Sequence, residues 1–386
     1  MLTKRETGIL FILSIIPFII YALIRPDLAG QDTYYFISHM CHGTPIVHQP
    51  ELVYFIFSII PCNFLVFKAI LWFLFFFSLL SIAMLGKVFF PEHGYWAAIL
   101  AMCSPLLLLE FLKLENDQFA FPIIFFAIFL FFYKKNEKNP EISQKNQKFF
   151  DFFKKNQIFS LILLFLVAFF IWNGAYIVLV ALLISQVFGF VAVGWIGIFF
   201  FEKFYTRFSI QDLTVAENMP LHAISYWFAA SAGIWGLPRK MWLPAGIILV
   251  SALVYLKFAV LALPFLAVGL LFLTDEFPKS RYLFIGVALA FLLAFPFTFT
   301  TQPPTLAQWD VVDYLKDLNE PFENQWSYGY WVMYKGLETD RFGGKQITEP
   351  DYNGISLTYV DLNCPILKEE GLMKLFDCRS DKVKIR

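Results

Sequence analysis

Long apolar runs separated by short polar islands dominate the chain down to about residue 299. A helix needs about 17–25 mostly apolar residues to cross the hydrocarbon core of a bilayer. We expect about eleven such helices, over residues 8–25, 63–85, 95–112, 118–133, 157–172, 175–188, 189–201, 221–237, 241–256, 258–273 and 282–299. The pattern predicts a polytopic α-helical membrane domain over residues 1–300.

After residue 300 the chain becomes polar and its periodicity changes. The segment LAQWDVVDYLKDLN has apolar residues at helical spacing, and PILKEEGLMKLF also predicts a helix. The segments GYWVMY, GISLTYV and the closing KVKI favour strands. We therefore expect a small mixed α/β domain over residues 301–386.

Composition supports a membrane protein. Charged residues make up 16% of the chain and hydrophobic residues 59%, whereas soluble domains contain about 25% charged residues. The mean hydropathy is +0.63. The net charge of zero excludes the basic footprint of a nucleic-acid-binding protein, so membrane lipid is the expected environment.

Lysine and arginine predict how the helices are oriented, because cytoplasmic loops collect these residues. The basic start MLTKRETG and the loop 134–156, which carries seven Lys, both belong in the cytoplasm. Arg239–Lys240 and Lys279–Arg281 fall on the same side only if residues 175–201 cross the membrane twice; a single crossing is the alternative. With two crossings, the N-terminus is cytoplasmic, the C-terminal domain is extracytoplasmic, and four polar islands face outward in the cell membrane: Arg25–Glu51, Lys113–Asp117, Glu202–Pro220 and the chain after Thr300.

The cysteines are scattered and show neither a CxxC motif nor zinc-site spacing. They are Cys41, Cys62, Cys103, Cys364 and Cys378. The last two lie in the polar tail. They can pair if that tail is extracytoplasmic, or remain two free thiols.

Four acidic residues stand in three of the outer islands. They are Asp32 in AGQDTYYF, Glu115 and Asp117 in LKLENDQF, and Glu217 in DLTVAENMP. An acid-x-acid pair can hold one divalent cation through two carboxylates. Such hard oxygen ligands suit Mg²⁺ or Mn²⁺. A cation of this kind suits a reaction with a phosphate or pyrophosphate leaving group. The alternative for each residue is an ordinary acid at a helix end, where interfacial placement costs little.

These islands resemble the motifs of oligosaccharyltransferase catalytic subunits, the GT-C membrane glycosyltransferases of protein N-glycosylation. AGQDTYYF is similar to the first-loop Asp motif, ENDQ to the DxD/ExD motif, and TVAENMP to the SVSE/TIxE motif of the fifth external loop. IWNGAYIVLV resembles the WGGY-type helix start, and NQWSYGYW resembles the WWDYG motif of the extracytoplasmic domain. The motifs occur in the order of the family, and the resemblance spans nearly the whole chain.

The resemblance implies a role for each matching residue. Asp32 and Glu217 would act on the amide of the acceptor Asn, and both would ligate Mn²⁺ or Mg²⁺ together with Glu115 and Asp117. Lys257, which stands where the family has Arg, would pair with the (pyro)phosphate of a lipid-linked donor. The alternative for Lys257 is a Lys that snorkels to the membrane interface.

The resemblance further implies that Trp326, Ser327 and Tyr328 line an acceptor pocket. The family has Asp where this chain has Ser327, so dependence on an N-x-S/T sequon stays open. The chain also has about eleven expected spans where the family has thirteen, and FISHM stands in place of His-Leu-Arg after the first-loop tyrosines. Three histidines near Asp32 are either extra metal ligands or surface residues: His39, His42 and His48.

The expected function is transfer of a glycan from a polyprenyl (dolichyl) phosphate or pyrophosphate carrier to the Asn amide of an acceptor polypeptide. One alternative is a GT-C transferase that moves a single sugar from polyprenyl phosphate to a lipid, a glycan or Ser/Thr. Another is an inactive paralogue or a transporter. A transporter should carry acids within its spans and show internal repeats, and this sequence shows acids at one face and no repeat.

Overall fold

The computed structural model of the chain describes the following residues: 2–24, 31–43, 51–102, 104–135, 157–172, 175–184, 233–254, 258–276, 279–280, 282, 286, 306–324, 329–337, 354–358, 361–370 and 373–379. This part of the chain is mostly helical and contains one four-stranded sheet. The expected span 189–201, most of 221–237 and of 282–299, and the KVKI strand lie outside the described residues.

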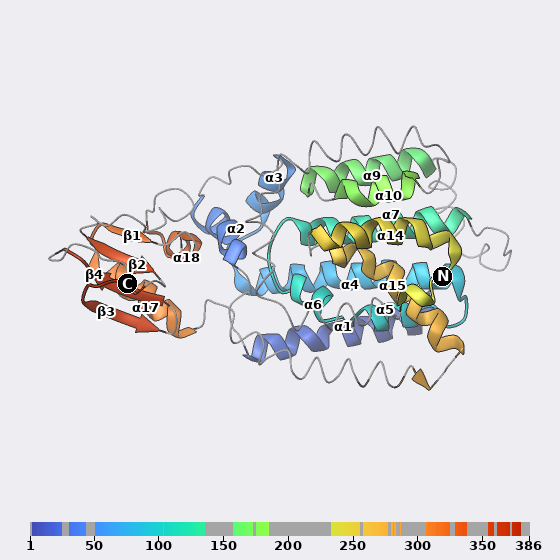
Figure 1. Cartoon of the computed structure of the whole chain (residues 1–386), viewed down its shortest axis with the longest axis horizontal. Coiled ribbons are helices and arrows are strands. Elements are labelled where there is room, and N and C mark those ends of the chain that lie inside the picture. Colours follow the sequence, from blue (N-terminus) through green and yellow to red (C-terminus); the bar gives the residue numbers. More distant parts are fainter. Residues whose placement is uncertain are drawn as a thin grey trace. The chain divides into compact units, whose positions relative to one another are not determined.

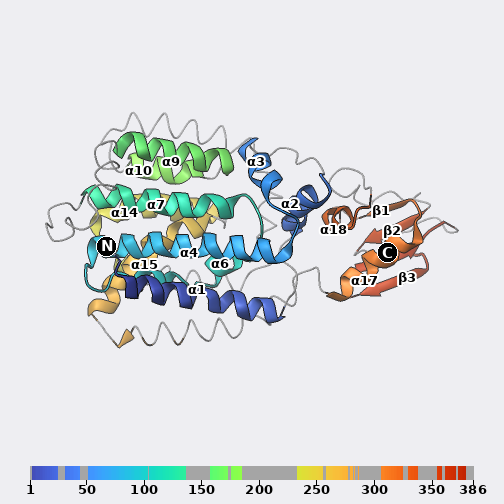
Figure 2. The same cartoon turned by 180° about the vertical axis from the view of Figure 1, so that it is seen from behind.

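The chain divides into two compact units (Figures 1 and 2). Unit 1 comprises Met1–Ile24, Ala69–Phe111 and Asn116–Phe295. Unit 2 comprises Arg25–Lys68, Leu112–Glu115 and Pro296–Arg386. The sequence places a boundary near residue 300, and the structure adds two earlier segments to the unit that contains the C-terminal chain.

Unit 1 is built from helices that the apolar runs predict. They are α1 (Lys4–Ile24), most of α4 (Phe64–Phe89), α5 (Trp96–Met102), α6 (Pro105–Glu110), α7 (Asp117–Lys135), α9 (Gln157–Ile171), α10 (Tyr176–Ile184), α14 (Arg239–Val254) and α15 (Phe258–Glu276). Within the described residues, three stretches are helical, long and apolar enough to cross a membrane: Phe64–Phe89, Asn116–Tyr133 and Phe258–Asp275.

The run expected as a single span over residues 95–112 consists of two short helices. Helix α5 ends at Met102, and α6 begins at Pro105. Proline has no N–H to continue the ladder and disfavours helical conformation in the residue before it, but it suits the first position of a new helix. Pro105 therefore accounts for the break between α5 and α6, which mean hydropathy alone does not predict.

Phenylalanine rings provide much of the packing inside unit 1. The ring of Phe111 lies between Phe75 of α4 and Phe121 of α7, with centroids 5.5 and 5.8 Å away. Toward the end of α7, Phe132 meets Phe265 of α15 edge-on at 6.1 Å. Tilted and edge-on ring pairs are favourable beyond the area that they bury, so the abundance of Phe serves helix packing here.

Glycine permits the closest backbone approach in unit 1. A Cβ added at Gly269 of α15 would lie 1.9 Å from the backbone oxygen of Gly233, and one at Gly236 would lie 2.0 Å from that of Gly269. Small residues at such crossings are typical of helices that pack within membranes.

A buried ion pair fastens α1 to the turn that follows α4. Lys87 Nζ lies 2.6 Å from Glu6 Oε1 and donates to the carbonyl oxygens of Pro91 and Glu92 at 2.7 and 2.9 Å. Glu6 also accepts from the N–H of Thr3 at 2.7 Å, while Thr3 Oγ1 accepts from the N–H of Glu6 at 3.2 Å. This reciprocal pair is a capping box, which satisfies donors at the start of the helix.

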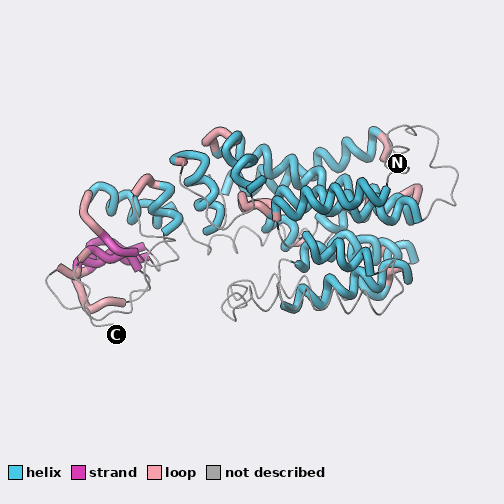
Figure 3. The backbone as a smooth tube through the Cα atoms, turned by 90° about the horizontal axis from the view of Figure 1, so that it is seen from above, coloured by secondary structure: helices cyan, strands magenta, loops and turns pink. Residues whose placement is uncertain are grey.

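Unit 2 combines helices from both ends of the sequence with the sheet, whose strands are magenta in Figure 3. Its elements are α2 (Gln31–His42), α3 (Glu51–Ile59), the first turn of α4, α17 (Leu306–Leu318), β1 (Phe322–Asn324), α18 (Gly329–Tyr334), β2 (Ile355–Thr358), β3 (Ile366–Glu370) and β4 (Met373–Asp377). The strand order is β1-β2-β4-β3; β1 runs parallel to β2, and the other neighbours are antiparallel.

Helix α17 packs on β3 and β4, and α2 packs on α3 and α18. The helix expected from LAQWDVVDYLKDLN and the strand expected from GISLTYV are thereby confirmed as α17 and β2.

The segment PILKEEGLMKLF, which we expected to be a helix, is a β-hairpin. Strands β3 and β4 are antiparallel, with Glu370 opposite Met373. Met373 and Leu375 are buried, while Lys374 between them lies close to Asp361 and Glu369. The neighbouring Phe376 is buried as well, so β4 is an inner strand of the sheet with buried side chains on both faces.

Long-range constraints explain why the helix prediction is wrong. Cys364 directly precedes Pro365 and β3, Cys378 directly follows β4, and a disulfide joins the two. The N–H of Asp377 also donates to the carbonyl of Pro365 at 2.9 Å. Pairing in the sheet together with this cross-link outweighs the local helical preference of the Lys-Glu-Glu stretch, since strand preference depends strongly on context.

The segment GYWVMY, which we expected to be a strand, is helix α18. Its Trp331 and Val332 are buried. The helix ends in a Schellman motif, in which Leu337 N–H donates to Val332 O and Gly336 N–H donates to Met333 O, with Gly336 at φ 77°. The glycine that follows the aromatic residues was a signal for this helix end, and aromatic richness misled the strand assignment.

Candidate functional site

Helix α2 carries Asp32 as its second residue. The helix begins at Gln31 and ends before Gly43, which has a φ of 69° and whose N–H donates to the carbonyl of His39 at 2.8 Å. An acid in the first turn of a helix is favoured by the helix dipole. The side chain of Asp32 lies outside the described residues.

A buried hydrogen bond joins α2 to the acidic loop that precedes α7. The N–H of Leu114 donates to Thr33 Oγ1 at an N···O distance of 2.9 Å, and both residues are fully buried. Thr33 follows Asp32 in the chain, and Leu114 precedes Glu115. The first and second acidic islands therefore meet within unit 2.

Glu115 and Asp117, the two acids of the ENDQ segment, are 5% and 0% exposed. Helix α7 begins at Asp117, so this carboxylate belongs to the first helical turn, where negative charge is favoured. Cα atoms two residues apart lie within about 7 Å of each other because consecutive Cα atoms are about 3.8 Å apart. This closeness in the chain is the reason for treating the two acids as a candidate pair.

Asn116, between the two acids, links the start of α7 to the end of α9. Its Nδ2 donates to the carbonyl of Ile171 at 3.0 Å. The ring of Trp172 packs against Phe121 of α7 at 5.5 Å and against Phe258 of α15 at 6.0 Å. The start of the IWNGAY segment thus meets the acidic end of α7 and the beginning of α15 inside unit 1.

Glu110 is a buried acid that the sequence analysis did not single out. It is the last residue of α6 and is 2% exposed. Gln118 Nε2, next to Asp117 in the chain, lies 3.5 Å from Glu110 Oε2. The signal in the sequence was an acid that directly follows four leucines, because a charge within an apolar run marks a functional candidate.

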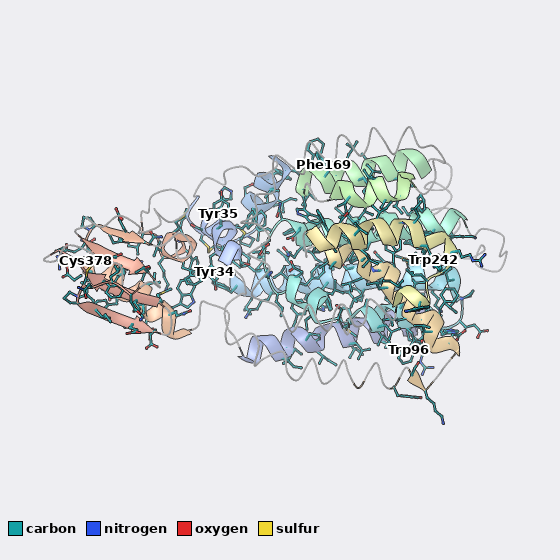
Figure 4. The ribbon with its side chains drawn as sticks, in the orientation of Figure 1. Tyr34, Tyr35, Trp96, Phe169, Trp242 and Cys378 are labelled. Atoms are coloured by element: carbon teal, nitrogen blue, oxygen red, sulfur yellow. A yellow bond between two sulfur atoms is a disulfide. The ribbon has the colours of Figure 1, made fainter. Side chains whose placement is uncertain are left out.

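Aromatic rings fasten α2 to α17 and α18; Figure 4 labels Tyr34 of α2. Tyr34 of α2 lies 5.0 Å from Trp309 and 5.4 Å from Tyr334, and these two rings lie 5.6 Å from each other. His42, at the end of α2, donates from Nε2 to the carbonyl of Tyr334 at 2.7 Å, since a carbonyl can only accept. The helix that contains Asp32 is therefore held against the helix that follows the NQWSYG segment.

The predicted acceptor residues Trp326, Ser327 and Tyr328 lie outside the described residues. Their nearest described neighbours in the chain are Asn324, a buried residue at the end of β1, and Gly329, the first residue of α18. Helix α18 packs on α2. Gly329, the residue that directly follows the motif, therefore belongs to a helix that contacts the helix containing Asp32.

Some of the remaining predicted site residues are described by the structure, and others are not. Glu217, Lys257 and His48 lie outside the described residues. His39 is half-buried, and His42 is engaged with Tyr334. In the part of the chain that the structure describes, no group of three or more His, Cys, Asp or Glu side chains is placed to hold a metal ion. That part excludes the Asp32 side chain and Glu217, two of the four expected ligands.

Both disulfides found among the described residues belong to unit 2. Cys41 at the end of α2 pairs with Cys62 just before α4, and Cys364 pairs with Cys378. The second pair is one of the two alternatives that the sequence left open, whereas the first had no signal in the spacing. Structural disulfides persist in oxidising compartments.

Comparison of the chain with protein-family models, with curated proteins and with solved structures gives no match.

Proposed function

We propose that this chain is a membrane glycosyltransferase of the oligosaccharyltransferase type, with a GT-C-like membrane domain of about eleven helices. It moves a glycan from a polyprenyl phosphate or pyrophosphate carrier to the side-chain amide of Asn in an acceptor polypeptide. The reaction takes place at the outer face of the cell membrane, and its partners are the lipid-linked donor, the acceptor chain and membrane lipid.

The observation that carries the proposal is the meeting of three motif-bearing segments at α2. This helix contains Asp32 and is joined through Thr33 to the residue before Glu115. It also packs against α18, which directly follows the acceptor motif. A chance likeness of short motifs gives no reason for segments so distant in the sequence to meet.

The disulfides support an extracytoplasmic location for unit 2. Both cross-links lie in segments that the distribution of Lys and Arg assigns to the outer side. An oxidising compartment is where such bonds form and persist, and this argument is independent of the charge rule. The cytoplasmic end of unit 1 then includes the N-terminus and Arg239–Lys240, beside the exposed Trp242 (Figure 4), as expected for an aromatic residue at a membrane interface.

Asp32, Glu115, Asp117 and Glu217 are the proposed ligands of Mn²⁺ or Mg²⁺. The chemistry of this donor set fits, because hard divalent cations prefer carboxylate oxygens. Burial of Glu115 and Asp117 adds to the fit, since a bound cation offsets the cost of gathering negative charge away from water. When bound, the cation stabilises the charge that grows on the phosphate oxygens of the donor.

The side chains of the protein act on the acceptor and on the leaving group. Asp32 and Glu217 accept hydrogen bonds from the two N–H groups of the Asn amide and weaken delocalisation of the nitrogen lone pair. The nitrogen forms a bond to the anomeric carbon while the bond from that carbon to the phosphate oxygen breaks, and the oxygen keeps the electron pair. One amide proton passes to a carboxylate and then to solvent. Lys257 pairs with the departing phosphate, so positioning and electrostatics lower most of the barrier.

Trp326, Ser327 and Tyr328 line the acceptor pocket in this proposal. Ser327 stands where the family has an acid, and its hydroxyl makes weaker hydrogen bonds to an incoming group than a carboxylate does. The same substitution favours a second candidate, a transferase that moves one sugar from polyprenyl phosphate to a lipid, glycan or Ser/Thr acceptor, because that reaction needs no sequon pocket.

The test is glycopeptide formation by the purified protein. It would be given a lipid-linked oligosaccharide extract, Mn²⁺ and a fluorescent peptide that contains N-x-T. The controls are an N-x-A peptide, a peptide with Gln in place of Asn, and the Asp32→Ala variant. We expect a metal-dependent product that requires both Asn and Asp32, and the N-x-A peptide reports how strongly Ser327 limits sequon recognition.

Absence of product with every Asn peptide would contradict the proposal, provided that the protein is folded and receives its native lipid donor. Sugar transfer to a lipid or to a Ser/Thr peptide in the same preparation would then establish the second candidate. Absence of all transfer would leave the inactive paralogue.

A further inference from the structure

The starts of α1 and α14 lie at the same end of unit 1 as the ends of α4 and α15 (Figures 1 and 4). The buried ion pair described above joins the first turn of α1 to the end of α4. His93, in the turn after α4, lies 2.9 Å from Asp275 near the end of α15, measured from Nε2 to Oδ1. A Cβ added at Gly236, just before α14, would lie 2.9 Å from Leu273 Cγ of α15. These contacts bring the basic starts of two helices together at one end of the unit.

Exposed cations gather at this end. They are Lys4–Arg5 in the first turn of α1 and Arg239–Lys240 in the first turn of α14. Within the described residues, these cations outnumber the exposed acids of the same end, Glu92 and Asp275. The ion pairs found in that part of the chain do not include Arg239. The guanidinium of Arg239 is therefore available to an external anion.

Helix α14 continues from Arg239 as an exposed apolar stripe. Trp242, Leu243 and Val250 are 59%, 52% and 64% exposed. Gly246 between them is exposed too, and a Cβ added there would meet no atom within 4 Å. Residues three or four apart lie on one face of a helix, so these positions form one stripe with the cation at its head. Such a stripe has the same order of charge and apolar surface as an amphiphile.

Two tryptophans flank the cations. Trp235, four residues before Arg239, is 84% exposed. Trp242 donates from Nε1 to the carbonyl of Leu237 at 2.6 Å, which fixes its ring at the start of α14. Tryptophan is enriched at the level of the lipid headgroups, where one side of the ring is apolar and the other is wet. Arg239 and Lys240 are therefore placed for contact with headgroups.

We propose that Arg239, Lys240 and the apolar stripe of α14 bind an anionic phospholipid. The cations hold the phosphate of the headgroup, because the planar guanidinium fork matches phosphate oxygens and anionic lipids attract cations beside a membrane span. Trp242, Leu243 and Val250 contact an acyl chain. A free phosphate compound would leave this stripe uncovered, and the ammonium of a zwitterionic lipid would oppose the cations. The inference concerns unit 1 and does not depend on glycan transfer.

The experiment measures lipid binding to the full-length detergent-solubilised protein by native mass spectrometry. The probes are phosphatidylglycerol and phosphatidylcholine with the same acyl chains, each with and without excess inorganic phosphate. Arg239→Gln removes the charge, and Arg239→Lys keeps it. Arg5→Gln is the matched control, because it removes the same charge from an exposed position in the first turn of α1, where the segment KRETGILF contains no Trp.

We expect the wild type to bind phosphatidylglycerol more tightly than phosphatidylcholine. Arg239→Gln should weaken binding of phosphatidylglycerol by about 5-fold, the effect of one cation near an anionic surface, and should leave binding of phosphatidylcholine unchanged. Arg239→Lys should keep most of the preference, and Arg5→Gln should keep nearly all of it. Inorganic phosphate should not displace the lipid.

Four outcomes would overturn the proposal. Equal affinity of the wild type for the two lipids would show that the headgroup charge is not recognised. An equal loss in Arg5→Gln and Arg239→Gln would show attraction by the whole basic end rather than a site on α14. Displacement by inorganic phosphate would identify a free anion as the ligand. A parallel loss of both lipids in both Arg239 variants would assign the effect to lost structure.

Discussion

Units 1 and 2 achieve stability by different means. Unit 1 consists of helices that follow apolar runs and pack through rings such as Phe111 and Phe121 and through glycine contacts. Unit 2 gathers segments from residues 25–68, 112–115 and beyond 296 around short strands. It contains the two disulfides of the described residues. The difference teaches that unit 2, which contains Asp32 and Glu115, depends most on contacts between distant parts of the sequence.

The largest expected effect concerns the buried ion pair of unit 1. Lys87→Met would leave Glu6 buried without its cation, and breaking a buried pair in this way costs about 3–5 kcal/mol. Thermal unfolding of the detergent-solubilised protein should show a clear loss of stability. The double variant Glu6→Gln with Lys87→Met should recover most of it, and equal instability of both variants would show that the charge on Glu6 is not the cause.

Reduction of the disulfides should affect unit 2 alone. The Cys364–Cys378 bond closes a loop of 14 residues, and closure of a loop of about this length contributes about 3 kcal/mol. Hydrogen exchange measured by mass spectrometry should become faster in β3, β4 and α2 after reduction, while α7 and α15 keep their protection. If reduction accelerated hydrogen exchange in α7 as much as in β3 and β4, the separation into two units would be contradicted.

A pair of glycine variants tests close packing in unit 1. Gly269→Ala places a methyl group against the backbone of Gly233 and should cost about 1–3 kcal/mol, as overpacking does. Gly246→Ala in α14 meets no atom within 4 Å and should stabilise the helix by about 0.5–1 kcal/mol through helix propensity. The melting temperatures of the two variants should therefore move in opposite directions, and a shared direction would disprove the assigned contact.

The smallest effect is a pH dependence at the edge of unit 2. Hydrogen bonds from the Arg379 side chain and its backbone N–H lower the pKa of Asp377 to about 2. A carboxyl with a lowered pKa stabilises the fold above its unfolded pKa of about 3.9, and this contribution is lost as the pH falls through about 2. The melting temperature of the wild type should exceed that of Asp377→Asn slightly at pH 5, and the two should converge near pH 2. A difference that persists at pH 2 would mean that the charge on Asp377 is not responsible.

Local pattern was sufficient for the helices of unit 1. The runs 118–133 and 258–273 predict helices that the structure has as Asp117–Lys135 and Phe258–Glu276. Helical periodicity also predicted α17 in unit 2. In these segments the residues that favour the helix are the same residues that pack, so local preference and tertiary contact agree.

The sequence was insufficient where distant contacts decide the outcome. The β3–β4 hairpin depends on β2 and on Cys364–Cys378, and the pairing of Cys41 with Cys62 is not deducible from spacing. For the candidate site, motifs located Glu115 and Asp117 and the acid after four leucines was a signal for Glu110, but burial was needed to reveal Thr33. A hydroxyl that receives a backbone N–H from 81 residues away leaves no local pattern.

The contact between His42 and Tyr334 has a consequence for the order of events during synthesis. The two residues are 292 positions apart, and a ribosome adds about 5–20 residues per second. Helix α2 therefore waits roughly 15–60 s after its own translation before α18 emerges. Cys62 follows Cys41 by only 21 residues, so the cross-link can secure α2 throughout this interval. During most of its synthesis, the nascent chain therefore lacks the contact between α2 and α18. The candidate site can assemble only after the last segments of unit 2 have been translated.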